Sequence, residues 1–163
     1  MDHLEDYQDL RVLVVEDDRD SRLLTVALLE EIGVGRIKQA ADGAEGLRVL
    51  RGFQADMVFC DMVMAPMDGL RFIRHVRTDT ESANPYLPII LVTANADRGS
   101  VRAARDAGVN LLMAKPVTLE GLRKRIDMAL NERREFIMNK SYVGPDRRRV
   151  DVPIAGRRDR RKD

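Results

Sequence analysis

This chain of 163 residues lacks the features of a secreted or membrane-spanning protein. It has one cysteine, Cys60, which cannot form a disulfide within the chain, and this favours a reducing compartment. No segment approaches the roughly 18 uncharged apolar residues that a membrane-spanning helix needs. Residues 1–9 are acidic and contain no apolar stretch of the kind found in export signals. We therefore expect a cytoplasmic protein that makes no membrane contact.

Charge is distributed unevenly along the chain. The net charge of +1 combines an acidic body over residues 1–140, with 20 Lys and Arg against 23 Asp and Glu, and a basic tail over 141–163, with 8 against 4. The length suits one domain of ordinary size with a short addition. We divide the chain into an N-terminal extension over 1–9, a main domain over 10–138 and an arginine-rich tail over 139–163.

Apolar runs and amphipathic segments alternate along the main domain. Apolar runs predict strands at 11–15, 55–60, 87–92 and 110–113, and residues 36–40 are expected to form a further short strand. Apolar residues at helical spacing predict helices over 19–32, 43–51, 69–78, 97–107 and 118–138. This alternation predicts an α/β fold with a doubly wound, five-stranded parallel sheet, (βα)5, whose two faces are covered by right-handed crossovers.

Polar residues follow four of the expected strands closely. They are Glu16 with Asp17, then Asp61, Thr93 and Lys115. In open parallel sheets ligands bind beyond the carboxyl ends of the strands, so these residues should meet in one crevice. Converging carboxylates repel one another unless a cation binds, and oxygen ligands without a nearby His or active Cys favour Mg²⁺.

Such a set of groups is typical of a phosphoryl-transfer site. Asp61 is the candidate nucleophile, because a carboxylate can form an acyl phosphate. Glu16 and Asp17 would hold the metal, Thr93 would donate to a phosphoryl oxygen, and Lys115 would pair with Asp61 or with the phosphoryl group. Each residue alone is more often a cap or a solvated turn, but all of them in this order favour one site.

These strings resemble a known family. Val14-Val15-Glu16-Asp17-Asp18, Asp61 followed by Met67-Asp68-Gly69, Thr93-Ala94 and Lys115-Pro116 are similar to the receiver domain of bacterial two-component response regulators, which is CheY-like. The resemblance covers roughly residues 10–135. It implies a strand order of 2-1-3-4-5. It also implies phosphorylation of Asp61 by a histidine kinase or phosphotransfer protein in phosphorelay signal transduction.

The same resemblance implies a metal site. Mg²⁺ would be held by Asp17, Asp61 and the backbone carbonyl of Val63, with Glu16 acting through water. The chain would be a phosphoacceptor and not an enzyme, limited to self-phosphorylation from small donors and self-dephosphorylation. A phosphatase of the haloacid-dehalogenase type is disfavoured, because those enzymes place a second acid where this chain has Val63.

Two further expectations concern activation. By the resemblance, Thr93 would move toward the phosphoryl group, and the bond between Lys115 and Pro116 would be cis. One position departs from the common pattern, because Leu112 stands three residues before Lys115, where many receivers carry an aromatic switch residue. A Tyr or Phe rotation there cannot transmit the signal.

The tail contains seven Arg and one Lys in residues 141–163, and its composition predicts a disordered or ligand-ordered segment. Guanidinium groups bind phosphates through paired hydrogen bonds. The tail resembles the extensions of a CheY-like subclass that binds cyclic di-GMP. The candidate contacts to cyclic di-GMP or another polyanion are Tyr142, Asp146, Arg147, Arg148, Arg149, Arg157, Arg158, Asp159 and Arg160.

Two functional hypotheses follow. In the first, the chain is a stand-alone response regulator phosphorylated on Asp61, with output by contact with a protein target and tuning by cyclic di-GMP at the tail. In the alternative it is a ligand-binding adaptor, with cyclic di-GMP or another polyanion as the main input. The tail could also be a plain solubilising segment, or bind RNA, DNA or an acidic protein surface. Nucleic acid is the less favoured partner, because 23 residues are too few for a DNA-binding domain.

Overall fold

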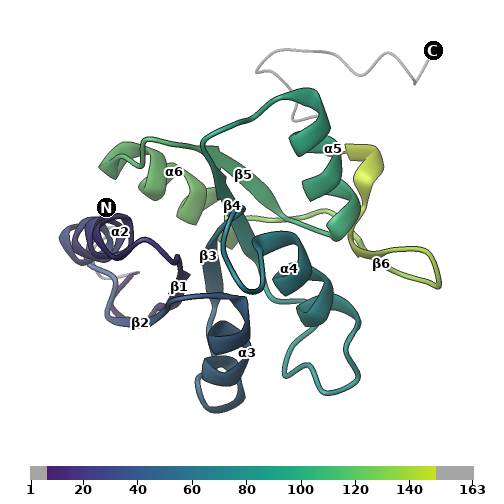
Figure 1. Cartoon of the computed structure of the whole chain (residues 1–163), viewed down its shortest axis with the longest axis horizontal. Helices are drawn as coiled ribbons and strands as arrows, with labels where there is room; N and C mark the ends of the chain where they lie inside the picture. Colours follow the sequence, from purple (N-terminus) through teal and green to yellow (C-terminus); the bar gives the residue numbers. More distant parts are fainter. Residues whose placement is uncertain (1–6, 150–163) are drawn as a thin grey trace.

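A computed structural model describes residues 7–149, and its centre is a five-stranded parallel sheet (Figure 1). The strands are β1 (Arg11–Val15), β2 (Arg36–Ala40), β3 (Met57–Asp61), β4 (Ile89–Thr93) and β5 (Leu111–Ala114). Their order is β2-β1-β3-β4-β5, with every neighbouring pair parallel. The predicted fold class and strand order are confirmed.

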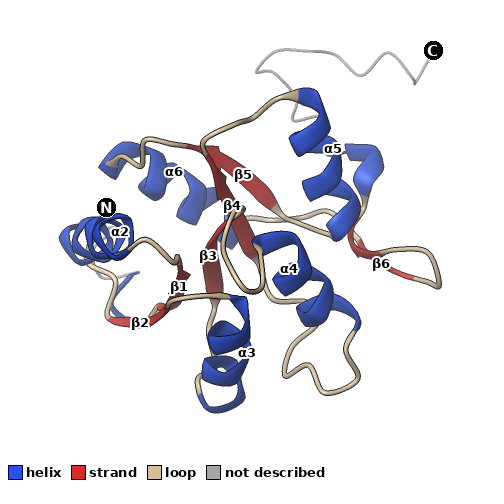
Figure 2. Ribbon diagram, in the orientation of Figure 1, coloured by secondary structure: helices blue, strands red, loops and turns tan. Residues whose placement is uncertain are grey.

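Helices cover both faces of this sheet (Figure 2). They are α2 (Arg19–Ile32), α3 (Gly43–Gly52), α4 (Gly69–Thr78), α5 (Arg98–Ala107) and α6 (Leu119–Leu130). Helices α2 and α6 share one hydrophobic core with the sheet, and α3, α4 and α5 share the other. Among residues 7–149, no helix is long and apolar enough to cross a membrane.

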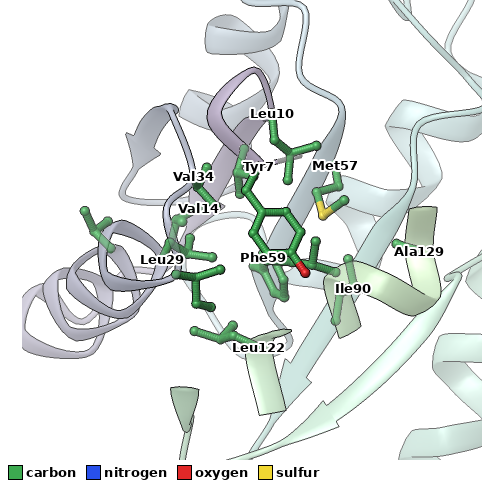
Figure 3. Close-up of a cluster of buried hydrophobic side chains, with 14 of the residues drawn as sticks. Tyr7, Leu10, Val14, Leu29, Val34, Met57, Phe59, Ile90, Leu122 and Ala129 are labelled. Carbon is green, nitrogen blue, oxygen red and sulfur yellow. The ribbon is translucent and has the colours of Figure 1, made fainter. Parts of the chain in front are cut away.

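Side chains of the central strands alternate between the two cores. In β1, Leu13 lies in the core of α3, α4 and α5, whereas Val14 lies in the core of α2 and α6. Figure 3 shows the second of these cores, where Phe59 of β3 lies among side chains from both helices, including Leu29 and Leu122. Burial on both faces explains why β1, β3 and β4 read as apolar runs, whereas the edge strand β2 is largely exposed and mostly polar.

Every helix from α2 to α6 begins with a capping side chain. Each cap accepts a hydrogen bond from the backbone N–H three residues later, and the caps are Asp18, Asp42, Asp68, Asp97 and Thr118. Caps of this kind contribute about 1 kcal/mol each. They determine the residue at which each helix begins.

The last helix is shorter than the predicted 118–138. It ends at Leu130, and the chain continues as an antiparallel hairpin of β6 (Phe136–Met138) and β7 (Val143–Pro145). A 3₁₀ turn, η1 (Arg147–Arg149), follows the hairpin. The prediction was wrong because apolar residues near 136 continue a helical spacing, whereas in the structure they cover a buried side chain of α4.

The tail was predicted to be disordered or ordered by a ligand, but its first part, up to residue 149, packs against the domain. Tyr142 and Asp146 are buried, and the Tyr142 hydroxyl donates to the backbone oxygen of Pro145 at 2.7 Å. A side-chain carbon at Gly144 would lie 2.7 Å from the Cα of Gly108, so β7 packs directly against the end of α5. The predicted boundary between 138 and 139 therefore falls inside one hairpin.

The predicted N-terminal extension also contains a core residue. Tyr7 is 1% exposed, packs in the core shown in Figure 3, and donates its hydroxyl hydrogen to Asp127 of α6. A single aromatic residue in an acidic stretch has no periodicity, and for this reason the sequence pattern did not reveal its burial.

Arg77, at the end of α4, joins the hairpin to the sheet. The residue is 2% exposed, and its guanidinium donates hydrogen bonds of 2.7–2.9 Å. The acceptors are the backbone oxygens of Pro85, Leu87 and Gly108 and the side-chain oxygen of Asn110. Phe136 of β6 packs on it, with the guanidinium carbon 5.1 Å from the ring centre. Burial lowers the pKa of Arg77 to about 10, so the side chain stays charged at neutral pH.

We predict that Arg77→Ala destabilises the protein by about 3–5 kcal/mol, because several buried oxygens lose their donor at once. Arg74→Ala is the matched control, since Arg74 is exposed on the same helix and its loss should cost less than about 0.5 kcal/mol. Urea unfolding followed by circular dichroism measures both effects. Equal losses for the two variants would show that the buried network does not hold the fold.

Candidate functional site

The four sets of polar residues predicted from the sequence lie at the carboxyl ends of β1, β3, β4 and β5. Asp61 is the last residue of β3 and Thr93 the last of β4. Glu16 follows β1 directly, and its backbone N–H donates to Ala40 of β2. Lys115 follows β5, and its backbone N–H donates to Thr93 at 2.8 Å. Backbone pairing of neighbouring strands thus fixes all four positions.

Three carboxylates converge at this edge. Glu16, Asp17 and Asp61 each place an oxygen within 4.8 Å of the other two. Glu16 and Asp61 are buried, while Asp17 is exposed. An all-oxygen donor set with one open side fits a hard divalent cation such as Mg²⁺, which retains several water ligands.

Val63 was predicted to offer its backbone carbonyl to the metal. It lies in the loop after Asp61, and its side chain is exposed. The loop is held close to the sheet edge, because Met62 donates to Val92 and Gly69 donates to Met62. A side-chain carbon at Gly69 would lie 2.3 Å from the backbone oxygen of Asp61, so this close return of the chain requires glycine. The ligand role of the Val63 carbonyl stays a prediction.

Lys115 is the cation of the site. Its Nζ donates to Asp61 Oδ2 at 3.0 Å and to Glu16 Oε1 at 3.2 Å. Burial alone would lower the pKa of Lys115, but the hydrogen bonds and negative charges of Asp61 and Glu16 outweigh burial and raise the pKa. The ammonium group therefore bridges two of the three carboxylates. The cis bond expected between Lys115 and Pro116 is present.

The environment of the carboxylate cluster shifts the pKa of Glu16. Burial and the hydrogen bond with the Asp61 side chain raise the pKa of Glu16 to about 7, although the Asp18 N–H and Lys115 oppose the rise.

Arg22 supports Glu16 and was not identified from the sequence. Its Nη1 donates to the backbone oxygen of Glu16 at 2.8 Å, and its Nε donates to Gln39 at 3.1 Å. An arginine one turn into a helix has no sequence signal that separates such a role from ordinary exposure.

Thr93 is buried, and its hydroxyl is engaged with the following loop. It donates to the backbone oxygen of Asn95 and accepts from the Asn95 N–H, each at 3.0 Å. The hydroxyl therefore has to leave these partners before it can donate to a phosphoryl group. Leu112, at the position of the usual aromatic switch, is half-buried in β5 and packs beside the core of α3, α4 and α5.

The tail residues lie away from this edge. Tyr142 and Asp146 are buried in the packed hairpin segment. Arg147 lies over the Tyr142 ring at 4.1 Å and pairs with Asp106 of α5 at 2.9 Å, while Arg148 pairs with Asp146. Arg149 ends η1. The remaining candidates, Arg157, Arg158, Asp159 and Arg160, lie outside the described residues.

Comparisons with known proteins agree with this geometry. Residues 12–127 match the model of the response regulator receiver domain. The chemotaxis protein CheY-3 of Vibrio cholerae is 31% identical over 120 residues, which are 74% of this chain and 91% of that protein.

Solved structures are also similar. One is the receiver domain of the sensor histidine kinase PA1611 from Pseudomonas aeruginosa, which has a magnesium ion coordinated in its active-site cleft. It is 27% identical with a TM-score of 0.68, and the match covers 76% of this chain and 99% of that one. Another is CheY4 of Vibrio cholerae, which is 26% identical with a TM-score of 0.69 and matches 74% of this chain and 98% of that one.

The raised pKa of Glu16 predicts a pH dependence of stability without metal. The folded state holds the Glu16 proton up to about pH 7, whereas an ordinary glutamate loses it near 4.5. The free energy of unfolding should therefore fall as pH rises from about 4.5 to about 7, and the loss should persist above that range. Urea titrations in EDTA measure this slope. Glu16→Gln should flatten it, and an unchanged slope in that variant would contradict the assignment.

Proposed function

The chain belongs to the response regulator receiver family, and we propose that it accepts a phosphoryl group on Asp61 from a histidine kinase or phosphotransfer protein. The observation that supports this most strongly is the placement of one ammonium and three carboxylates at the ends of three strands. In this proposal the protein is a phosphoacceptor in a phosphorelay and does not turn over an external substrate.

The chemistry assigns one task to each group. An oxygen of Asp61 forms the new O–P bond while the N–P bond of the donor phosphohistidine breaks, and the donor nitrogen keeps the electron pair. Lys115 stays within reach of the charge that develops on the phosphoryl oxygens. Thr93 donates its hydroxyl hydrogen once it leaves Asn95. A bound Mg²⁺, held by Asp17 and Asp61 with Glu16 beside it, would supply charge neutralisation to the phosphoryl oxygens.

A recess of about 390 Å³ beside the site supports docking of such a donor. It is lined by site residues and by apolar groups of α2 and of the segment after Lys115, including Leu24, Pro116 and Val117. Leu24, which lines the recess, is 50% exposed, and its neighbour Leu23 on α2 is 41% exposed. They offer an apolar contact for the protein that carries the phosphohistidine.

We predict that incubation with Mg²⁺ and acetyl phosphate adds one phosphoryl group, seen by intact-mass spectrometry, because Asp61 is the nucleophile. Asp61→Asn should abolish the addition. Asp79→Asn is the matched control, since Asp79 is an exposed acid at the end of α4, and it should be labelled like the wild type. Labelling of the Asp61 variant to the wild-type extent would refute the proposal.

A second proposal concerns cyclic di-GMP at the tail. The Arg148 side chain is 77% exposed, and Asp146 fixes its guanidinium at 2.7 Å. An oriented and accessible guanidinium fork suits phosphate oxygens or a guanine edge. In this proposal cyclic di-GMP tunes the output, which otherwise proceeds by contact with a protein target.

Calorimetry with cyclic di-GMP tests this proposal on the full chain. Truncation after Lys140 would remove β7 and disturb the fold, so point variants are the better choice. Arg147→Gln combined with Arg148→Gln should weaken binding at least about tenfold, which is a loss of about 1.4 kcal/mol. The exposed pair Arg123→Gln and Arg133→Gln is the charge-matched control and should leave binding unchanged. Equal binding by all three proteins, or no binding, would exclude the tail as this site.

A further inference from the structure

A second recess lies at the opposite edge of the sheet from the carboxylate cluster. Its volume is about 490 Å³, and its lining comes from the start of β1, the segment before β3, the last turns of α3 and α4, and the loop after α4. Helices α3 and α4 lie next to each other in Figure 1. Small-molecule sites in proteins are recesses of this size. The second recess shares no lining residue with the recess beside Asp61.

The buried part of this lining is apolar. Val76 of α4 and Leu87 before β4 are buried, and Leu47, Leu50 and Phe53 at the end of α3 are half-buried. All five belong to the core of α3, α4 and α5 or pack against it. A ligand with a large apolar group would cover these side chains and remove apolar surface from water.

Arg11 brings an unpaired donor to the same lining. Its Nε is buried, and within residues 7–149 this atom donates no hydrogen bond. The Oδ2 atom of Asp56 lies 3.8 Å from it, beyond hydrogen-bond distance, and accepts from the Arg11 backbone N–H at 2.8 Å. A buried donor without an acceptor is destabilising. Its place in the lining of a recess therefore indicates an acceptor from outside the chain.

Arg11 and Asp56 present opposite charges side by side. Their side chains are 36% and 39% exposed, so a ligand can reach both. A free amino acid likewise holds a carboxylate and an ammonium group on the same carbon. The guanidinium suits the carboxylate, and the aspartate suits the ammonium group. Helix α3 ends at Gly52, shortly before Asp56, and the partial negative charge of a helix carboxyl end also favours an ammonium group.

The rest of the lining does not favour a net charge of either sign. It contains Arg51, His75, Asp79 and Glu81, and His75 pairs with Asp79 at 3.4 Å. With the first pair included, the charged groups are two arginines, one histidine and three acids. A purely anionic ligand would meet the three acids, and a purely cationic one would leave the Arg11 donor unpaired. A zwitterion avoids both conflicts.

We propose that the second recess binds a free amino acid with a large apolar side chain. The carboxylate of the ligand accepts from Arg11, its ammonium group donates to Asp56, and its side chain packs on the apolar lining around Phe53. The site lies apart from the carboxylate cluster, so the inference goes beyond the phosphoacceptor function and does not depend on it.

NMR titration of the isotope-labelled full chain tests the site with L-phenylalanine and three probes that each lack one of its groups. Phenylethylamine lacks the carboxylate, 3-phenylpropionate lacks the ammonium group, and glycine lacks the apolar side chain. L-phenylalanine should bind at least about tenfold more tightly than each of the others. The largest shifts of amide signals should occur at Phe53, Asp56 and His75.

Substitution of the paired charges tests the assignment of the groups. Arg11→Gln and Asp56→Asn should each weaken binding of L-phenylalanine at least about tenfold. Arg36→Gln is the matched control and should retain affinity within about twofold, because Arg36 pairs with Arg11 in the β1–β2 register but does not line the recess. The probe series uses the wild-type chain, so it decides the question even where a variant unfolds. Equal binding of the four probes, no binding of L-phenylalanine, or an equal loss in Arg36→Gln would overturn the inference.

Discussion

Lys115 bridges two of the three carboxylates that converge, and repel one another, at the edge of the sheet. Its ammonium group contacts Asp61 and Glu16, and Asp17 lies on the open side of the cluster. This arrangement needs parallel strands, because only then do β1, β3 and β5 deliver their polar ends to the same edge. The crowding of carboxylates favours binding of a cation, and in the proposed function Asp61 is the nucleophile.

The other end of the molecule is organised around a second buried cation. Arg77 donates hydrogen bonds to oxygens of the loop before β4, the end of α5 and the start of β5, and the hairpin covers it. Helix α5 connects the two ends. It begins shortly after Thr93 and ends at Gly108, which contacts β7. The loop bonded to Thr93 therefore leads into one end of this helix, and the hairpin contacts its other end.

The sequence predicted the sheet and the cluster well because both depend on local signals. Apolar runs indicated β1, β3, β4 and β5, and the polar residues after these four runs indicated where the chain leaves the sheet. The hairpin was not predicted because Phe136 is positioned by its contact with Arg77, which is 59 residues earlier in the sequence. Neither the burial of Arg77 nor the support that Arg22 gives to Glu16 has a periodic signature. Both arise from tertiary packing.

The central claim is that Asp61 is the residue that forms the acyl phosphate. Borohydride reduction of the phosphorylated protein, followed by peptide mass spectrometry, tests it most directly, because reduction converts an aspartyl phosphate to homoserine at the modified position. We expect homoserine at position 61 and at no other aspartate position. Homoserine at another position, or its absence from a protein that retains the phosphoryl label, would contradict it.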